Sequence, residues 1–503
     1  MAGPLYAATD AGGYSPDLPL PLSPVIPSDV DPALINALNK KGEFAKTQRV
    51  FDVYSWQQFL AINWPTGEQG KPAPKLTDTG FGPPAWTRWH EAFELFRADG
   101  QPPLLSDPMA AKPVRQAVTS RHGISLGALA TTDRSKRVLS IVSATKALTV
   151  LDETTQAFTH PLWDQHGNLA YYEILMNDTE TQYIVKNELY NFDGQIAFAA
   201  NHNSLNMPAG LFNHPEQPGS IEIKLAWKIL DETAGDVAQR YFTTTATVLK
   251  DDGGKGWRDV KVGLVGMHIA HKTGTSPQWT WSTFEHVDNL QVNPLDTADV
   301  NGKSQPLQPS FNNPDCPTCL VNTYPPTKDA ASGQLRTQVT RVVPIPLDTQ
   351  QLNRDVQAQL HEMGSVWQYY QLIGTQWPTD PSAPPTTPGP NTLPDSVDNK
   401  PGGRPTPVYL ANSIMETYFQ LGNQPVGTEE QGAPAVTDQI FATESCMGCH
   451  YSAGIASAFT ISPSGVKTAL FNGPSSSDFS WMFQQLAHFR TTDKTEPAKK
   501  PAP

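Results

Sequence analysis

Four cysteines limit the chemistry open to this chain of 503 residues, because they fall into two C-x-x-C pairs. The pairs are Cys316 with Cys319 and Cys446 with Cys449. Random placement would give about 0.02 pairs at this spacing in a chain of this length. His450 follows the second pair directly and completes the pattern C-x-x-C-H. Both pairs are therefore expected to have a chemical role, and the two roles are expected to differ.

The C-x-x-C-H pattern is the attachment motif of c-type haem. Cys446 and Cys449 would each form a thioether to a vinyl group of the porphyrin, and His450 would lie under the iron as its proximal ligand. A disulfide or a zinc knuckle is the alternative interpretation. Zinc would need further Cys or His at ligand spacing, and none follows before His488. The motif therefore predicts one covalent haem c.

Residues 405–490 resemble a c-type cytochrome domain. The motif lies between a helix-like segment, Pro407–Gln420, and an amphipathic segment, Phe479–Phe489. The run Trp281–Asn289, upstream of a single haem motif, looks like the large bacterial proteins of the cytochrome c family. That group has no settled activity, and the domain-level resemblance covers under a fifth of the chain. It implies covalent haem, export and redox function, and it supplies no substrate.

The first cysteine pair is followed by Leu320, so it is not a second haem site of the same kind. Its flanks, 312–315 and 321–326, are rich in Asn and Pro, which is typical of loops. A structural disulfide between Cys316 and Cys319 is the favoured interpretation. A redox-active disulfide, free thiols or a metal site are the alternatives.

Compartment and partners follow from the cysteines and from the charge. Thioether attachment is, in the resembled family, carried out outside the bacterial cytoplasm, where disulfides also persist, so we expect a periplasmic or extracellular protein. The chain begins with no recognisable signal peptide, and the expectation is that the leader has been removed. The net charge of −13, without a basic run, argues against nucleic acid. No apolar stretch suggests a transmembrane segment. The expected partner is a redox protein or a small-molecule substrate, and the oligomeric state is not predicted.

Proline distribution and hydrophobic periodicity predict a multidomain α+β chain. A large antiparallel, sandwich-like β-rich region with flanking helices would precede a small all-α, cytochrome c-like domain at the C-terminus. The predicted segments are 1–50, an extended proline-rich strap; 51–135, a helical segment packed on the β domain; 136–347, the β-rich domain; 348–377, a helix; 378–407, a proline-rich linker; 408–490, the haem domain; and 491–503, a disordered tail.

The clearest predicted strand is Ile221–Ile229, where apolar and polar residues alternate over nine positions. Three further strands are expected at Tyr241–Leu249, Val260–His271 and Trp279–Val287. Apolar residues at helical spacing predict helices at Tyr54–Asn63, Ala85–Phe96 and Asp348–Trp367, the last with Asp348 as its N-cap.

The sixth iron ligand would separate an electron carrier from a haem with an open site. Met482, 32 residues after His450, is the first candidate, although it also fits an apolar helix stripe. Met415 is the second candidate and His488 a weaker one, whereas Met447 lies within the attachment loop and is excluded.

An open site, or a histidine from the β-rich region, remains the alternative. The histidines in question are His268, His271 and His286, and strand alternation puts His268 and His271 on opposite faces. A separate metal site on these strands is disfavoured for that reason. Glu285, His286 and Asp288 would suit acid–base work, but buried polar groups of this kind more often bond the backbone or each other.

Three functional hypotheses follow. The first is a periplasmic monohaem c-type cytochrome that transfers single electrons, with the β-rich region binding a partner or substrate. The second is a haem oxidoreductase of peroxidase or oxygenase type, with an open distal face at the domain junction. Four aromatic residues are candidates to line that junction or to relay electrons, and core packing explains them equally well: Trp367, Tyr369, Tyr370 and Trp377. The third is a haem-containing binding or sensory protein. No catalytic residue is assigned from the sequence.

Overall fold

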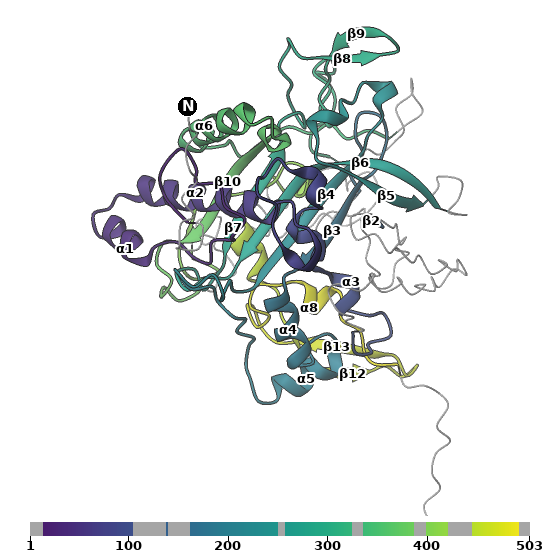
Figure 1. The fold of residues 1–503 in the computed structure, drawn as a ribbon. Helices are drawn as coiled ribbons and strands as arrows, with labels where there is room; N and C mark the ends of the chain where they lie inside the picture. Colours follow the sequence, from purple (N-terminus) through teal and green to yellow (C-terminus); the bar gives the residue numbers. More distant parts are fainter. Residues whose placement is uncertain are drawn as a thin grey trace, which may run out of the picture.

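A computed structural model describes residues 14–103, 161–249, 257–323, 335–386, 399–420 and 445–491, with the backbone of 137 and 138. Its centre is a nine-stranded sheet in the order β1-β3-β4-β6-β7-β10-β11, with β5 beside β6 and β2 beside β5 (Figure 1). All pairs are antiparallel except β2 with β5. The strands are β1 (His90–Glu91), β2 (Arg137–Val138), β3 (Ala170–Met176), β4 (Ile221–Ile229), β5 (Thr243–Leu249), β6 (Trp257–His271), β7 (Thr280–His286), β10 (Tyr370–Pro378) and β11 (Pro405–Thr406).

The alternation in β4 confirms the predicted strand and separates two faces of the sheet. Ile221, Ile223 and Leu225 are fully buried in one large hydrophobic cluster. Glu222 and Lys224 project to the other face, because successive side chains of a strand point in opposite directions. β5, β6 and β7 also lie where the sequence predicts them, with ends shifted by one to three residues.

Helices cover the first face, which we call the helix-covered face. They are α1 (Pro32–Lys40), α2 (Phe44–Ile62) and α6 (Leu347–Glu362). Phe59 of α2 stacks on Phe284 of β7 with ring centroids 4.2 Å apart, and Leu352 of α6 joins the same cluster. The second layer of the β-rich region is thus helical among the described residues. The sandwich-like prediction is wrong in this respect, although the α+β class is confirmed.

Residues 399–420 and 445–491 pack on the opposite face, which we call the motif-covered face. This layer holds α7 (Cys446–His450), the hairpin of β12 (Ala456–Ile461) and β13 (Lys467–Phe471), and α8 (Met482–Gln485). In Figure 1 the hairpin and α8 lie beside α4 (Asp178–Lys186) and α5 (Phe192–Ala199). Side chains of 445–491 share one hydrophobic cluster with residues of 92–281.

The expectation of an all-α segment at 408–490 is wrong, because its described part contains the β12–β13 hairpin. The predicted helix Pro407–Gln420 is also wrong, since only a 3-10 turn forms there, η8 (Thr417–Phe419). Side chains take over the backbone donors that a helix would use: Glu285 Oε1 accepts from Ser413 N at 2.6 Å. The predicted helix Phe479–Phe489 shortens to α8.

Two further helix predictions change at their ends. Ala85–Phe96 divides into η3 (Ala85–Arg88), β1 and α3 (Ala92–Leu95), because His90 and Glu91 pair with β3 at the sheet edge. α6 begins at Leu347 with Pro346 as its cap residue, so Asp348 lies in the first turn and is not the N-cap. There its charge still favours the helix dipole.

Cys316 and Cys319 form the expected disulfide, with Cα atoms 5.5 Å apart. A small hairpin, β8 (Thr297–Val300) with β9 (Lys303–Pro306), precedes it. No helix of the described residues is long and apolar enough to cross a membrane. Several predicted segments fall partly outside the described residues: 1–13 of the strap, 104–135 of the helical segment, 136, 139–160, 250–256 and 324–334 of the β-rich domain, 387–398 of the linker, 421–444 of the haem domain and 492–503 of the tail.

Candidate functional site

The short helix α7 presents the two motif cysteines together. Ser445 caps it, with its Oγ accepting from Gly448 N. Gln376 of β10 fixes this helix to the sheet, because its Oε1 accepts from Met447 N at 2.8 Å and its Nε2 donates to Ser445 Oγ at 3.0 Å. Residues three positions apart on a helix lie on one side. Cys446 and Cys449 are therefore oriented alike and held by the sheet.

His450 is oriented by a backbone carbonyl. Its Nδ1 lies 2.7 Å from Phe479 O, and its ring lies 4.4 Å from the ring of Trp281 on β7. A carbonyl oxygen only accepts, so Nδ1 carries the proton and Nε2 keeps its lone pair. Burial lowers the pKa of His450 to about 4, so the imidazole is neutral at pH 7. This is the form in which histidine ligates a metal.

Both motif cysteines are free thiols. Burial raises the pKa of Cys449 to about 11 and raises the pKa of Cys446 well above its usual value, with the Glu416 carboxylate adding to both shifts. The thiols are thus protonated and are not bonded to each other. The zinc alternative gains no support, because the described residues contain no group of three His, Cys, Asp or Glu side chains placed to hold a metal.

Three titratable side chains face the motif from the sheet and from residues 399–420. Lys224 of β4 pairs across the strands with His268 of β6, and His268 Nε2 lies 2.8 Å from Glu416 Oε1. The side chains of His268 and Glu416 each keep 18% of their surface exposed.

Lys224, His268 and Glu416 influence the pKa values of the motif residues. Glu416 raises the pKa of both thiols, and the pKa of His450 responds to His268, Glu416 and Lys224. Burial alone would raise the pKa of Glu416, but His268 and Lys224 more than offset it and lower that pKa. Burial lowers the pKa of Lys224. The motif and these groups therefore lie within electrostatic range of each other.

The other predicted ligands lie in different surroundings. Met415 is fully buried and packs on the sheet at Gly266, where an added Cβ would lie 3.1 Å from Met415 Cε. Met482 begins α8 and is 2% exposed in the hydrophobic cluster that also holds Met447. His488 responds electrostatically to Asp99.

His271 and His286 are engaged elsewhere. His271 lies on the helix-covered face, where Nδ1 meets Tyr54 OH at 2.6 Å and Nε2 meets Pro218 O. His268 and His271 therefore lie on opposite faces, as predicted. His286 Nε2 lies 2.9 Å from Arg240 O, and its Nδ1 accepts from Asp288 N.

The proposed acid–base group on β7 is bound in ion pairs. Arg341 donates to the Glu285 carboxylate from Nη1 and Nη2, and Arg240 donates to the Asp288 carboxylate from Nε and Nη2. These carboxylates are structural, which agrees with the second interpretation given to them.

The four aromatic residues considered for the junction do not line the site. Trp367 and Tyr370 belong to the cluster on the helix-covered face, and Trp377 stacks on Phe51 of α2 at 4.7 Å. Tyr369 carries the guanidinium of Arg240 over its ring at 4.4 Å. Tyr370 and Trp377 of β10 pack on the helix-covered face, and Trp367 and Tyr369 precede that strand. These contacts support the alternative interpretation of the four rings as core packing.

Sequence reasoning missed Lys224, Glu416 and Gln376. Lys224 is one of the polar residues that alternate with apolar ones in β4, and this pattern is typical of a residue that faces solvent. Glu416 carries no local signal, since its importance arises only when residues 399–420 fold over the sheet. Comparison with known proteins adds no further evidence, because no family model, no curated protein and no solved structure matches this chain.

Proposed function

We propose that this chain is a c-type haem protein whose haem is attached through Cys446 and Cys449, with His450 Nε2 ligating the iron. The observation that carries the proposal is the donor set itself. Two reduced thiols share one side of α7, and the hydrogen bond to Phe479 O occupies the other nitrogen of His450. A backbone acceptor of this kind is what orients a ligating histidine.

Haem bound here supplies one-electron chemistry at its iron. The protein residues hold and shield that centre: Phe479 O fixes the tautomer of His450, Trp281 supports its ring, and Gln376 anchors α7 to β10. We propose single-electron transfer to a redox partner or small molecule as the function. Thioether attachment and the Cys316–Cys319 disulfide support a periplasmic or extracellular location.

A second candidate function is a haem oxidoreductase with an open distal face. The specific observation in its favour is the group formed by Lys224, His268 and Glu416, which keeps accessible surface beside the motif. Such side chains can move protons to and from a bound small molecule. Met482 and Met415 remain predicted ligands for the alternative in which both axial positions are filled by protein.

The absorption spectrum of the protein denatured in alkaline pyridine tests haem attachment. The protein is produced in a host that matures c-type cytochromes. We expect a haem c spectrum for wild type and its loss in the double variant Cys446→Ser, Cys449→Ser. The matched control is Cys316→Ser, Cys319→Ser, which removes the other pair and should keep the haem. Loss of haem only in the Cys316→Ser, Cys319→Ser control would contradict the assignment of the haem to Cys446 and Cys449.

Carbon monoxide separates the two functions. Prompt, complete binding to the reduced protein would favour the oxidoreductase, whereas a Soret band that stays unchanged would favour the electron carrier. In the second case Met482→Leu and Met415→Leu identify the ligand, because only the variant that loses its thioether should then bind carbon monoxide.

A further inference from the structure

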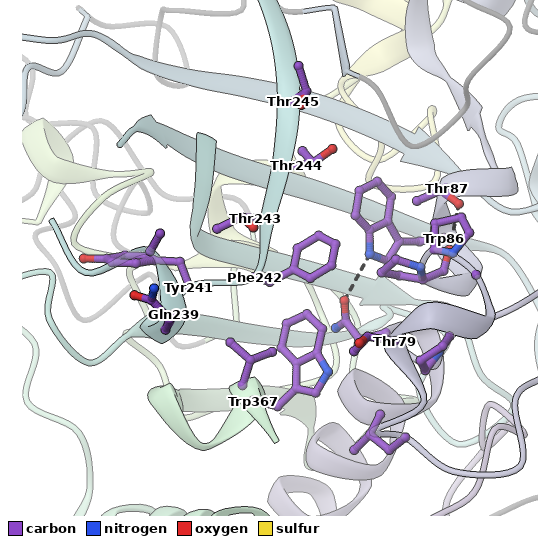
Figure 2. Close-up of a pocket in the computed structure, with 18 residues that line it drawn as sticks. Thr79, Trp86, Thr87, Gln239, Tyr241, Phe242, Thr243, Thr244, Thr245 and Trp367 are labelled. Carbon is purple, nitrogen blue, oxygen red and sulfur yellow. Dashed lines mark hydrogen bonds between the residues drawn. The ribbon is translucent and has the colours of Figure 1, made fainter. Parts of the chain in front are cut away.

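A cavity of about 690 Å³ opens on the side of the molecule away from α7. It lies between residues 63–87, the start of β5 and the 3-10 helix η6 (Val366–Tyr369). Figure 2 shows Trp86, Phe242 and Trp367 around it, with Thr243, Thr244 and Thr245 along β5. Its volume falls within the range of small-molecule pockets, roughly 300–1,000 Å³.

The described residues that line this cavity carry no charge. Its 18 residues include no Asp, Glu, Lys, Arg or His, whereas the chain average of 17% charged residues would give about three. The lining residues are Asn63, Pro65, Leu76, Thr79, Gly82, Pro83, Pro84, Trp86, Thr87, Ala238, Gln239, Tyr241, Phe242, Thr243, Thr244, Thr245, Val366 and Trp367. An ionic ligand would lose its hydration here without gaining a counter-charge, so the cavity selects neutral molecules.

Three aromatic rings form a rigid wall. Phe242 stacks on Trp367 with centroids 5.2 Å apart and planes 21° apart, and Trp86 meets Phe242 edge-on at 6.3 Å. The core holds these rings, since Trp86 is 1% and Trp367 is 3% exposed. Flat aromatic faces favour planar ligands that stack or meet them edge-on.

One indole donor at the cavity is available for recognition. The indole N–H of Trp86 donates to Asn63 Oδ1 at 3.0 Å, as Figure 2 shows. Trp367 also lines the cavity, and its indole N–H is not among the buried polar atoms that lack a partner in the described part of the chain, so the N–H is accessible from the cavity. An accessible donor exchanges water for a ligand oxygen, which fixes the orientation of the ligand and adds a modest free energy of binding.

We propose that this cavity binds a neutral, planar aromatic compound that carries a hydrogen-bond-accepting oxygen. The ring would lie along Phe242 and Trp367, and the oxygen would accept from Trp367 Nε1. The proposal is independent of the haem, because the cavity lies on the helix-covered face and shares none of its lining residues with the motif.

Isothermal titration of the full-length protein tests this proposal with two probes of one shape and different charge. The probes are 2-acetylnaphthalene, which is neutral with a carbonyl acceptor, and 2-naphthoate, which is an anion. We expect saturable one-to-one binding of the ketone and at least tenfold weaker binding of the carboxylate. Absence of saturable binding of the ketone, or equal affinity for both probes, would overturn the proposal.

Two variants locate the binding. Trp367→Phe keeps an aromatic ring and removes the N–H, and it should weaken the ketone about fivefold, the value of one ordinary hydrogen bond. Thr245→Trp, at an exposed lining position, should fill the cavity and abolish binding. The control Thr297→Trp makes the same change at an exposed position of β8, and it should leave the affinity unchanged. Unchanged binding in Thr245→Trp would show that the ketone binds elsewhere.

Discussion

At the scale of single residues, His268 is the side chain whose role most separates the two candidate functions. It is the one histidine of β6 and β7 that faces the motif, and it bonds Glu416 through Nε2. His271 and His286 have both ring nitrogens engaged in the core.

We expect His268→Ala to change the visible absorption and electron paramagnetic resonance spectra of the oxidised haem protein. The reason is that His268 and His450 interact electrostatically. His488→Ala is the matched control, since His488 responds to Asp99 instead. A spectrum that changes in His488→Ala and stays unchanged in His268→Ala would contradict a haem position near His268.

His286 makes the free energy of unfolding decrease as the pH falls. Burial lowers its pKa to about 4, so the folded state binds fewer protons than the unfolded state between pH 4 and the ordinary value of about 6.5. The stabilising contribution is present above pH 6.5 and is lost as the pH falls. From pH 7.5 to 5.5 the expected loss is about 1.3 kcal/mol of unfolding free energy.

Urea titrations of wild type and His286→Gln at both pH values measure this contribution. Asp29 and Glu222 act in the opposite direction, because burial raises their pKa values to about 6 and about 7. Asp29 and Glu222 are present in both wild type and His286→Gln. The difference between the pH dependences of their unfolding free energies is therefore due to His286. An identical pH dependence in both would contradict the account.

At the scale of elements, the attachment of α7 to β10 depends on one side chain. Gln376 bonds Met447 N and Ser445 Oγ, and it also donates to the carbonyls of Pro407 and Val408. Gln376→Leu leaves these groups without their partner, which should cost about 2 kcal/mol or more of unfolding free energy. Gln371→Leu makes the same change on the same strand, where the described residues offer the side chain no hydrogen bond, and should cost under about 1 kcal/mol.

Close packing between the sheet and residues 399–420 gives a second element-scale prediction. A Cβ at Gly266 would lie 3.1 Å from Met415 Cε, so Gly266→Val should push this segment outward and destabilise the fold by about 1–3 kcal/mol. Gly473→Val is the control, since nothing lies within 4 Å of its added Cβ. Equal unfolding midpoints in urea for the two variants would refute this packing.

Strands of this fold are more predictable than its helices. The alternation of Ile221–Ile229 reflects one buried face directly, and the observed β4 has the same bounds. Pro407–Gln420 has helical spacing, but Glu285 and Glu416 accept its backbone amides and prevent the helix. The bond from Ser413 to Glu285 joins residues 128 positions apart, so local propensity could not reveal it. The bond from Asn412 to Glu416 spans only four positions.

At the scale of the whole molecule, the residues of the candidate site pack against the central sheet. The sequence suggested a separate C-terminal domain, yet 445–491 shares its hydrophobic cluster with α3, β3 and β7. Cys446, Cys449 and His450 were identified from spacing alone. Lys224, His268 and Glu416 come within electrostatic range of them only because β4, β6 and residues 399–420 fold against the same face.

The sheet separates the candidate haem site from the cavity described above. One face carries the motif with its charged neighbours, and the other carries a neutral, aromatic cavity. The sheet lines the cavity through β5, whereas β7 and β10 contact the motif. Because the two sites share no residue, substitutions in the motif should leave the affinity of the cavity for 2-acetylnaphthalene unchanged. Titration of the Cys446→Ser, Cys449→Ser protein measures this independence.

The central claim is a covalent haem on Cys446 and Cys449. Mass spectrometry of the denatured protein, after production in a host with c-type haem maturation, tests it most directly. The account predicts a mass increased by one haem, with the increase located on the peptide that contains Cys446 and Cys449. A denatured protein at the mass of the bare polypeptide, with both thiols open to alkylation, would contradict it.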